Sequence, residues 1–308
     1  MAQKKGNGNG NGRLFSSQSS LDSYIKGVCD ILRRSNCAGA LQYVPELTWI
    51  LFLRILDDNE TREGEAHATV EREYLPSLAS PYRWQDWAAP EDRLHPKQGW
   101  KRKELANGAL GAYFSFVNGE LLPYLKDLKN QPNASPKQKV ISEILSGVER
   151  VRVDTEKNFL DVLDKVHEIK SENIDQAHIF TLSQVYEGLL LKMGEKGNDG
   201  GQFFTPRQII RAIVQTVDPK PGESIYDPCC GTGGFLAQAY EYEEARLGFL
   251  STSDELEGLK RTTFYGREKE NLVYPIALAN LVLHGIDEPH LWHGNTLTGQ
   301  ETYGGLFQ

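Results

Sequence analysis

The chain has 308 residues, of which 39% are hydrophobic and 25% charged, a composition typical of a folded globular protein. Its net charge of −8 argues against tight binding to nucleic acid through phosphate contacts alone. Its longest strongly apolar run, residues 49–56, contains Arg54 and is far shorter than the roughly 20 residues of a membrane-spanning helix. At roughly 100–200 residues per domain, the length indicates two domains.

The chain begins with a segment of low complexity. Lys4 and Lys5 precede an alternation of glycine and asparagine, and no apolar run follows, so the segment is not a secretory signal. We expect residues 1–13 to be a disordered tail, because this composition buries too little surface to fold. The cysteines form no C-x-x-C pattern, which favours the reduced thiols of a cytoplasmic protein and no metal site. They are Cys29, Cys37, Cys229 and Cys230.

Residues 14–170 are predicted to form a helical domain. Apolar side chains recur at helical spacing from Leu21 to Leu32, and Ser19 or Ser20 can cap the start of that helix. Three further apolar stripes predict helices over residues 47–55, 140–148 and 159–169. Residues 1–170 carry 24 basic and 23 acidic side chains, so this half is close to neutral.

An aromatic and polar stretch, residues 81–100, interrupts the helical pattern, and its prolines disfavour regular structure. It contains Trp84, Trp87 and Trp100. A basic cluster surrounds the last of these: Lys97, Lys101, Arg102 and Lys103. Two interpretations stay open. The cluster could contact a phosphate backbone, or it could be a solvated helix face.

The second half, residues 171–308, has a different pattern and holds 10 basic and 19 acidic side chains. Short apolar runs alternate with helical stretches, as in βαβ units with a parallel sheet. The predicted strands cover residues 224–227, 263–266 and 291–293, and the predicted helices cover residues 234–247 and 271–284. Parallel neighbours require right-handed crossovers through these helices.

The sharpest motif is a glycine-rich turn, YDPCCGTGGF, between the first of these strands and the helix after it. Without a Cβ, Gly231 and Gly233 let the backbone approach a ligand closely, and the following helix start favours a negative group. The motif is not a P-loop, because no lysine follows the glycines. It is not a complete dinucleotide fingerprint either, because Leu236 stands where the third glycine belongs.

A carboxylate follows the next predicted strand. Glu268 lies 35 residues beyond Gly233, and a carboxylate in that place can accept two hydrogen bonds from a ribose diol. The carboxyl ends of parallel strands share one edge of the sheet, where open α/β sheets bind their ligands. The combination of strand, glycine turn, helix and acid therefore predicts a ligand site at that edge.

These residues resemble the nucleotide-binding half of S-adenosylmethionine-dependent methyltransferases. They are most similar to the modification subunit of type I restriction-modification systems, in the family of N-6 adenine-specific DNA methyltransferases. The similarity lies in GGQFFTPR, DPCCGTGGF, FYGREKE and HGNTL, and in LRRSNCAGALQYVPELTWILFLRILDD within the helical half. It implies an α/β fold class: an N-terminal all-helical domain followed by the first half, three strands, of a Rossmann-like methyltransferase sheet in residues 171–308.

The resemblance implies S-adenosyl-L-methionine as cofactor. It assigns nine residues to that site: Phe203, Thr205, Pro206, Asp227, Pro228, Gly231, Gly233, Glu268 and Asn295. The first three would frame the methionine end of the cofactor, and the two glycines would allow close backbone approach. Asp227 would bring negative charge near the amino group and sulfonium, and Glu268 would hold the ribose hydroxyls. Asn295 would meet the adenine edge, where the family more often has aspartate. Alternatively, Phe203 is a core residue and Asn295 caps a turn.

The family's target-base motif, Asn or Asp followed by Pro-Pro and Phe or Tyr, occurs nowhere in the 308 residues. A target adenine must leave the base stack and be held by such groups before its amine can attack. The resemblance therefore assigns no catalytic residue, and we expect a C-terminally truncated chain that is inactive alone. A longer chain or a partner would then complete the sheet.

The function implied by the resemblance is transfer of a methyl group from S-adenosyl-L-methionine to adenine N6 in DNA. The implied partners are DNA, reached through a complex, a specificity subunit, a restriction subunit and a second modification subunit, with no membrane. Two alternatives remain. The chain could be a non-catalytic interaction module, or an amino-group methyltransferase that acts on proteins or small molecules, because one cofactor fold serves many substrates.

Overall fold

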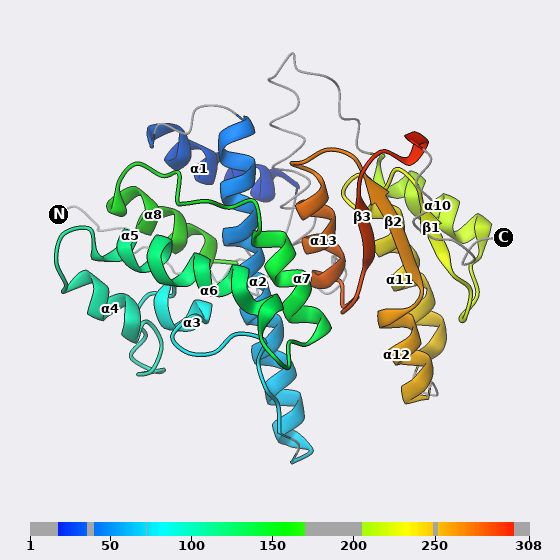
Figure 1. Cartoon of the computed structure of the whole chain (residues 1–308), viewed down its shortest axis with the longest axis horizontal. Coiled ribbons are helices and arrows are strands. Elements are labelled where there is room, and N and C mark those ends of the chain that lie inside the picture. The colour runs from blue at the N-terminus through cyan, green and yellow to red at the C-terminus, as the bar shows by residue number, and fades with distance from the viewer. Residues whose placement is uncertain (1–17, 36–39, 72, 170–204, 249–251, 299–308) are drawn as a thin grey trace, which may run out of the picture.

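The structure, a computed structural model, describes residues 18–35, 40–71, 73–169, 205–248 and 252–298. An N-terminal bundle of helices lies beside a three-stranded sheet that helices flank (Figure 1). No helix within these ranges is long and apolar enough to cross a membrane. The tail predicted over residues 1–13 lies outside them.

The helical half is organised around one long helix, α2 (Ala40–Thr69), which packs against α8, as α1 also does. The other helices of this half are α1 (Gln18–Arg34), α3 (Trp84–Trp87), α4 (Trp100–Ala106), α5 (Ala112–Phe116), α6 (Leu122–Asp127), α7 (Pro136–Leu145) and α8 (Glu156–His167). A π-helical turn, Val117–Leu121, joins α5 to α6, and a 3₁₀ turn, Leu128–Asn130, follows α6.

The four helices predicted in this half are confirmed as α1, α2, α7 and α8. The predicted cap of the first is wrong. Helix α1 begins at Gln18, so Ser19 and Ser20 are helical residues and neither has the extended backbone of a cap. Serine is tolerated inside a first helical turn, and a capping residue alone therefore does not fix where a helix starts.

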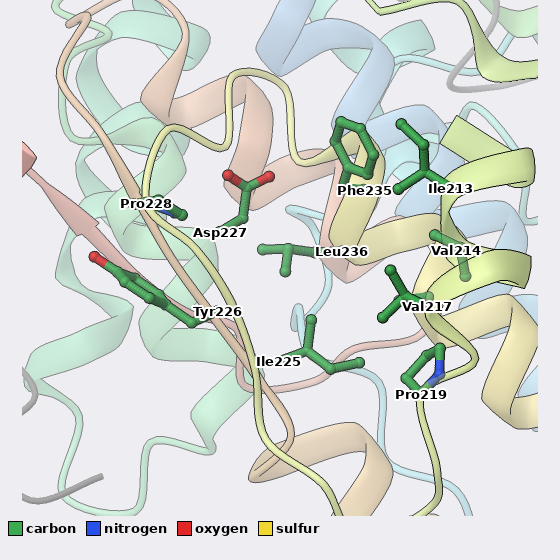
Figure 2. A pocket seen from close by; sticks show the side chains of 11 residues that line it. Ile213, Val214, Val217, Pro219, Ile225, Tyr226, Asp227, Pro228, Phe235 and Leu236 are labelled. Carbon is green, nitrogen blue, oxygen red and sulfur yellow. The ribbon is translucent and has the colours of Figure 1, made fainter. Parts of the chain in front are cut away.

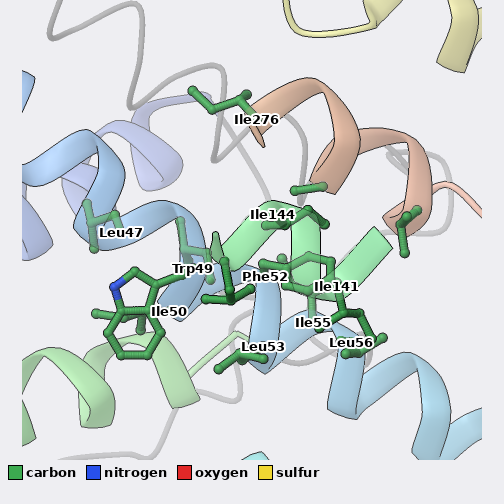
Figure 3. Close-up of a cluster of buried hydrophobic side chains, with 14 of the residues drawn as sticks. Leu47, Trp49, Ile50, Phe52, Leu53, Ile55, Leu56, Ile141, Ile144 and Ile276 are labelled. Atoms are coloured by element: carbon green, nitrogen blue, oxygen red, sulfur yellow. The ribbon is translucent and has the colours of Figure 1, made fainter. Parts of the chain in front are cut away.

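Large aromatic side chains fill the core of the helical half. Trp49 of α2 stacks on Trp87 with ring centroids 6.5 Å apart and lies 6.2 Å from the ring of Phe159. Figure 3 shows Trp49 beside the apolar residues of α2 and, further along, the isoleucines of α7. The stretch 81–100 is irregular apart from the four-residue α3, as expected, but its tryptophans Trp84 and Trp87 are buried in this core.

The sheet contains three parallel strands in the order β1 (Ile225–Asp227), β2 (Phe264–Glu268) and β3 (His290–His293). Its helices are α10 (Arg207–Val217), α11 (Gly234–Leu247), α12 (Ser253–Arg261) and α13 (Tyr274–Leu283), and a 3₁₀ turn, Thr296–Thr298, follows β3. The three predicted strands and both predicted helices are confirmed. Within the described ranges, β2 is the one strand that pairs with β1.

Two helices of the sheet half, α10 and α12, were not predicted. The start of α12 carries a readable signal, since Thr252 and Glu255 form a reciprocal capping box. Helix α10 carries a readable signal as well, because its isoleucines and valines recur at helical spacing between residues 209 and 217.

Helix α13 joins the two halves of the molecule. It packs against α2 and α7 of the helical half and against α11 of the sheet half (Figure 1). Its residues from Ile276 to Val282 are all buried, and the side-chain amide of Asn59 on α2 donates to the Leu283 carbonyl at 3.5 Å. A helix that is apolar on every face requires neighbours on every face.

Candidate functional site

The glycine turn after β1 depends on two residues in the left-handed region, Gly231 at φ +55° and Gly233 at φ +78°. A Cβ at Gly233 would lie 3.2 Å from Leu281 Cδ2, so this glycine allows α13 to pack closely beneath the turn. A Cβ at Gly231 would have nothing within 4 Å, so this glycine faces open space. The turn therefore has a packed inner side and an open outer side.

Glu268, at the end of β2, holds the turn although it is 37 residues away from Gly231. The Gly231 N–H donates to its Oε2 at 2.9 Å. The backbone N–H groups of Lys269 and Glu270 donate to its Oε1 at 2.8 and 2.7 Å. The structure thus brings the predicted acid to the predicted turn, as expected for the shared edge of two parallel strands.

Asp227, the last residue of β1, adds a second carboxylate to this edge. Its Oδ1 accepts the N–H of Cys229 at 3.1 Å. Burial raises the pKa of Asp227, the hydrogen bond from Cys229 lowers it, and the negative charge of Glu268 raises it further. Two neighbouring carboxylates favour a ligand that carries positive charge.

Pro228 and Asn295 lie near each other at the same edge. The Thr296 hydroxyl donates to the Pro228 carbonyl, and Arg267 donates from its guanidinium to the Asn295 carbonyl at 3.3 Å. The side-chain oxygen of Asn295 accepts the N–H of Leu297 at 2.9 Å and so caps the 3₁₀ turn. The capping alternative for Asn295 is therefore realised, and among the described residues its amide NH₂ group has no hydrogen-bond acceptor.

Only the end of the GGQFFTPR motif, which precedes β1, lies within the described residues. Thr205 and Pro206 are exposed and lead directly into α10. Helix α10 approaches the glycine turn, since a Cβ at Gly234 would lie 3.2 Å from Ile210 Cδ1. Phe203 lies outside the described residues, so both interpretations of its role remain predictions.

A cavity of about 300 Å³ opens beside β1, between α10 and α11. Figure 2 shows the apolar side chains of α10 opposite Ile225 and Phe235, with Asp227 and Pro228 on the same wall. No local sequence pattern predicts this cavity, because its lining residues come from α10, β1, α11 and the loops that follow α10 and β1. It is suited to an apolar group, with the carboxylate of Asp227 as its one charged lining group. In the part of the chain that the structure describes, no cluster of three metal-binding side chains is present.

Comparison with known proteins agrees with this architecture. Residues 177–304, which contain the glycine turn and all three strands, match the family model described as N-6 DNA Methylase. Residues 21–166, the helical half, match the model described as HsdM N-terminal domain. The fold is thus that of the N-6 DNA methylase class.

Three relatives narrow this class. The methylase subunit of the type I restriction enzyme EcoEI from Escherichia coli is 33% identical over 284 residues, which are 90% of this chain and 52% of the relative. The crystal structure of a modification subunit of a type I restriction enzyme from Vibrio vulnificus YJ016 has a TM-score of 0.76 at 30% identity, covering 91% of this chain and 56% of that one. A chain from a structure of the type I R-M system has a TM-score of 0.61 at 36% identity, covering 91% and 51%.

The chain belongs to the family of methylase subunits of type I restriction-modification systems. It spans about half the length of the curated relatives it matches.

Proposed function

We propose that the chain is part of an adenine-specific DNA methyltransferase subunit that binds S-adenosyl-L-methionine at the glycine turn. The observation that carries this proposal is the bond from the Gly231 N–H to Glu268 Oε2, within the N-6 DNA Methylase match. It joins the turn to an acid that the chain carries 37 positions later. Family membership and the name of the Escherichia coli methylase subunit support the activity.

The geometry at this edge fits the proposed cofactor. Open space above Gly231 leaves room for the amino-acid part of the ligand, and the carboxylate of Asp227 suits its positive charge. Each oxygen of a carboxylate offers two acceptor sites. Among the described residues, Gly231 is the one hydrogen-bond donor to Glu268 Oε2, so that oxygen keeps an acceptor site for a ribose hydroxyl.

The remaining site residues are proposed on the same basis. Thr205 and Pro206 would border the methionine end, with Phe203 beside them, and the amide of Asn295 would meet the adenine ring of the cofactor. Gly233 and Pro228 would shape the turn rather than contact the ligand by a side chain. We propose the division of the chain near residue 170 as the boundary between a helical and a cofactor-binding part.

The cofactor, held by the glycine turn, Asp227 and Glu268, would supply the methyl group for in-line transfer to the adenine N6 amine, with S-adenosylhomocysteine as the leaving group. That step depends on placement more than on a strong base. The chain's own residues would orient the cofactor and neutralise its charge. We propose that DNA is reached through a cytoplasmic complex with a specificity subunit, a restriction subunit and a second methylase subunit. The subject of one related structure, complex assembly of the type I R-M system, supports this proposal.

The cofactor part is tested by calorimetry with S-adenosylhomocysteine on the 308-residue chain. We expect heat of binding that Gly231→Val strongly reduces, because a branched side chain is strained at φ +55° and fills the open face. An unchanged affinity in this variant would contradict the proposed site.

The reaction part is tested by incorporation of labelled methyl groups into unmethylated DNA. We expect no N6-methyladenine from residues 1–308 alone, because no Asn-Pro-Pro-Phe type motif is present to hold a flipped adenine. Methylation of DNA by the purified chain would refute this expectation. Methylation of protein in place of DNA, with the partner subunits added, would favour the alternative amino-group methyltransferase.

A further inference from the structure

One polar side chain is buried in the middle of α13. The helix reads YPIALANLVL, and Asn280 is its one amide side chain, 5% exposed and surrounded by aliphatic residues. A buried amide is costly unless it is hydrogen-bonded. Its Nδ2 donates to the carbonyl of Thr232 at 2.9 Å, across 48 positions of the chain.

The acceptor is the central residue of the glycine turn. Thr232 is buried and stands between Gly231 and Gly233, the two residues with left-handed backbone. Turning the chain at both neighbours directs the Thr232 carbonyl toward α13 and away from the backbone bonds of the turn. Within the turn itself, the Gly233 N–H donates to the Cys230 carbonyl at 2.8 Å.

The turn is therefore held from two directions. Glu268 binds the Gly231 N–H from the end of β2, and Asn280 binds the Thr232 carbonyl from α13. The side chain of Leu281, next to Asn280, fills the space beneath Gly233. Because glycines have the largest conformational freedom of any residue, a turn with three of them requires such external contacts to keep one shape.

We infer that Asn280 is a positioning residue for the cofactor site, acting through the shape of the glycine turn. This inference rests on the proposed function for its effect on cofactor binding, but its effect on the turn is independent of any ligand. Asn280 does not line the open side of the turn, so its contribution is to fix the backbone N–H groups and the gap above Gly231.

The contact also links the turn to the helical half. Helix α13 packs on α2 and α7 of the helical half, and Figure 3 shows Ile276 at the start of α13, above the cluster of α2 and α7 side chains. Displacement of α13 against these helices would therefore move the donor that holds Thr232.

Two substitutions at one position test the inference. Asn280→Leu keeps the size of the side chain and removes the donor. Asn280→Asp also removes the donor while its carboxylate is ionised, but the protonated acid can donate to the Thr232 carbonyl. His284 directly follows α13, four positions beyond Asn280, and burial lowers its pKa to about 4, so it stays neutral between pH 6 and 8. Its Nε2 lies 3.5 Å from the carboxylate of Glu241 in α11, whose pKa burial raises to about 7.

The first measurement is amide hydrogen exchange, which needs no ligand. We expect Asn280→Leu to speed exchange in residues 229–235 about tenfold, while residues 264–268 of β2 are unchanged. The control is Ile276→Val, which removes one buried methyl group from α13 and leaves the Thr232 contact in place. It should lower thermal stability without faster exchange in the turn. Faster exchange in both Asn280→Leu and Ile276→Val would show that Asn280 stabilises the turn only as any other core residue does.

The second measurement is the dissociation constant for S-adenosylhomocysteine. We expect it to rise about tenfold in Asn280→Leu, a typical effect for one buried hydrogen bond. The dissociation constant of Asn280→Asp, divided by that of the wild-type chain, should fall toward one as the pH is lowered from 8 to 6. The same ratio for Asn280→Leu should stay constant. Taking the ratio at each pH cancels the titration of groups that both proteins share, such as Asp227 and Glu241.

The outcomes separate the two proposals. Wild-type exchange in the turn and wild-type affinity in both Asn280 variants would overturn the positioning role and leave the proposed function intact. If the wild-type chain binds no S-adenosylhomocysteine, the proposed function fails, and the exchange data still decide whether Asn280 holds the turn. If Asn280→Leu does not fold, Asn280→Asp decides whether Asn280 positions the turn: its affinity for S-adenosylhomocysteine should return to that of wild type at pH 6.

Discussion

The two halves of the molecule place their polar groups in opposite ways. In the helical half, charged side chains satisfy each other and the backbone. Buried Glu60 accepts the Ser77 N–H with both oxygens, at 3.1 and 3.2 Å, and Arg102 pairs with Asp164 at 2.6 Å. In the sheet half, the carboxylates of Asp227 and Glu268 gather at one edge, next to a glycine that faces open space.

Apolar groups follow the same division. In the helical half the aromatic rings of Trp49, Trp87 and Phe159 are buried, and exposed leucines such as Leu75, Leu94 and Leu110 lie in separate loops. In the sheet half the single helix α10 leaves Ile209, Ile213 and Val217 exposed, at 50%, 42% and 70%. Two of these side chains, Ile213 and Val217, line the cavity beside β1. The comparison teaches that the helical half obtains its stability from internal contacts, while the edge at β1 is shaped for contacts outside the described residues. Four predictions test this division.

The largest effect is expected from the aromatic core of the helical half. Phe159→Ala should lower the free energy of unfolding by about 3–5 kcal/mol, because a fully buried ring is removed and the helices cannot close the gap. Urea unfolding followed by circular dichroism measures this change. The control is Leu110→Ala, whose side chain is fully exposed and which should change stability by less than about 0.5 kcal/mol. Equal effects of the two changes would contradict the assignment of the core.

The next effect concerns the ligand edge and leaves the helical half untouched. Glu268→Gln should weaken binding of S-adenosylhomocysteine by about 30-fold, because a charged acceptor that holds three backbone N–H groups is lost. Calorimetry measures the affinity. The matched control is Glu270→Gln, an exposed carboxylate two residues further on, which should bind as wild type does. A loss of affinity in both would point to net charge rather than to the site.

Stability should depend on pH through buried acids in both halves. Burial raises the pKa of Glu46 in α2 and of Glu243 in α11, each to about 7. The native state then binds more protons than the unfolded state between roughly pH 4.5 and 7, so stability falls as the pH rises through that range. Thermal unfolding should show a free energy of unfolding higher by about 1 kcal/mol or more at pH 5.5 than at pH 8.

Buried His284 opposes this trend more weakly, because its lowered pKa removes stability as the pH falls below about 6.5. Glu46→Gln and Glu243→Gln show which half supplies the dependence, since each should flatten the profile in part. A profile that rises toward pH 8 in the wild-type chain would show that these acids are ionised in the folded state.

The smallest effect is expected at the basic cluster around Trp100. The structure pairs Lys101 with Glu104 at 2.8 Å and Lys103 with Glu91 at 2.6 Å, which favours the interpretation as a solvated helix face. Lys103→Ala should therefore change stability by less than about 0.5 kcal/mol and affinity for duplex DNA by less than about twofold. Fluorescence anisotropy at two salt concentrations measures the affinity. Exposed Lys139, replaced by alanine, serves as control, and a selective loss in Lys103→Ala would restore the phosphate-binding interpretation.

Sequence analysis was most accurate in the sheet half. The helix predicted over residues 234–247 has the observed bounds, and the meeting of Gly231 with Glu268 followed from parallel strands that share an edge. The reason is that glycines and short apolar runs mark clearly where the parallel strands end and the helices begin. The strand predicted over residues 263–266 extends further, to Glu268, because β3 pairs with β2 as far as that residue.

Contacts between distant segments could not be predicted in the same way. Trp84 and Trp87 lie in a proline-rich stretch that has no periodicity, yet both enter the core, because their partners come from α2, α5 and α8. Asn280 is one polar position in an apolar helix, and its partner at Thr232 is 48 positions away. No local pattern encodes such pairs.

The burial of α13 on every face has a thermodynamic consequence. Because α13 packs against both halves, unfolding of one half would remove contacts that stabilise α13 and, with it, the other half. The 308-residue chain should therefore melt in a single calorimetric transition, whose van't Hoff and calorimetric enthalpies agree. The boundary near residue 170 would then divide the sequence without dividing the cooperative folding unit.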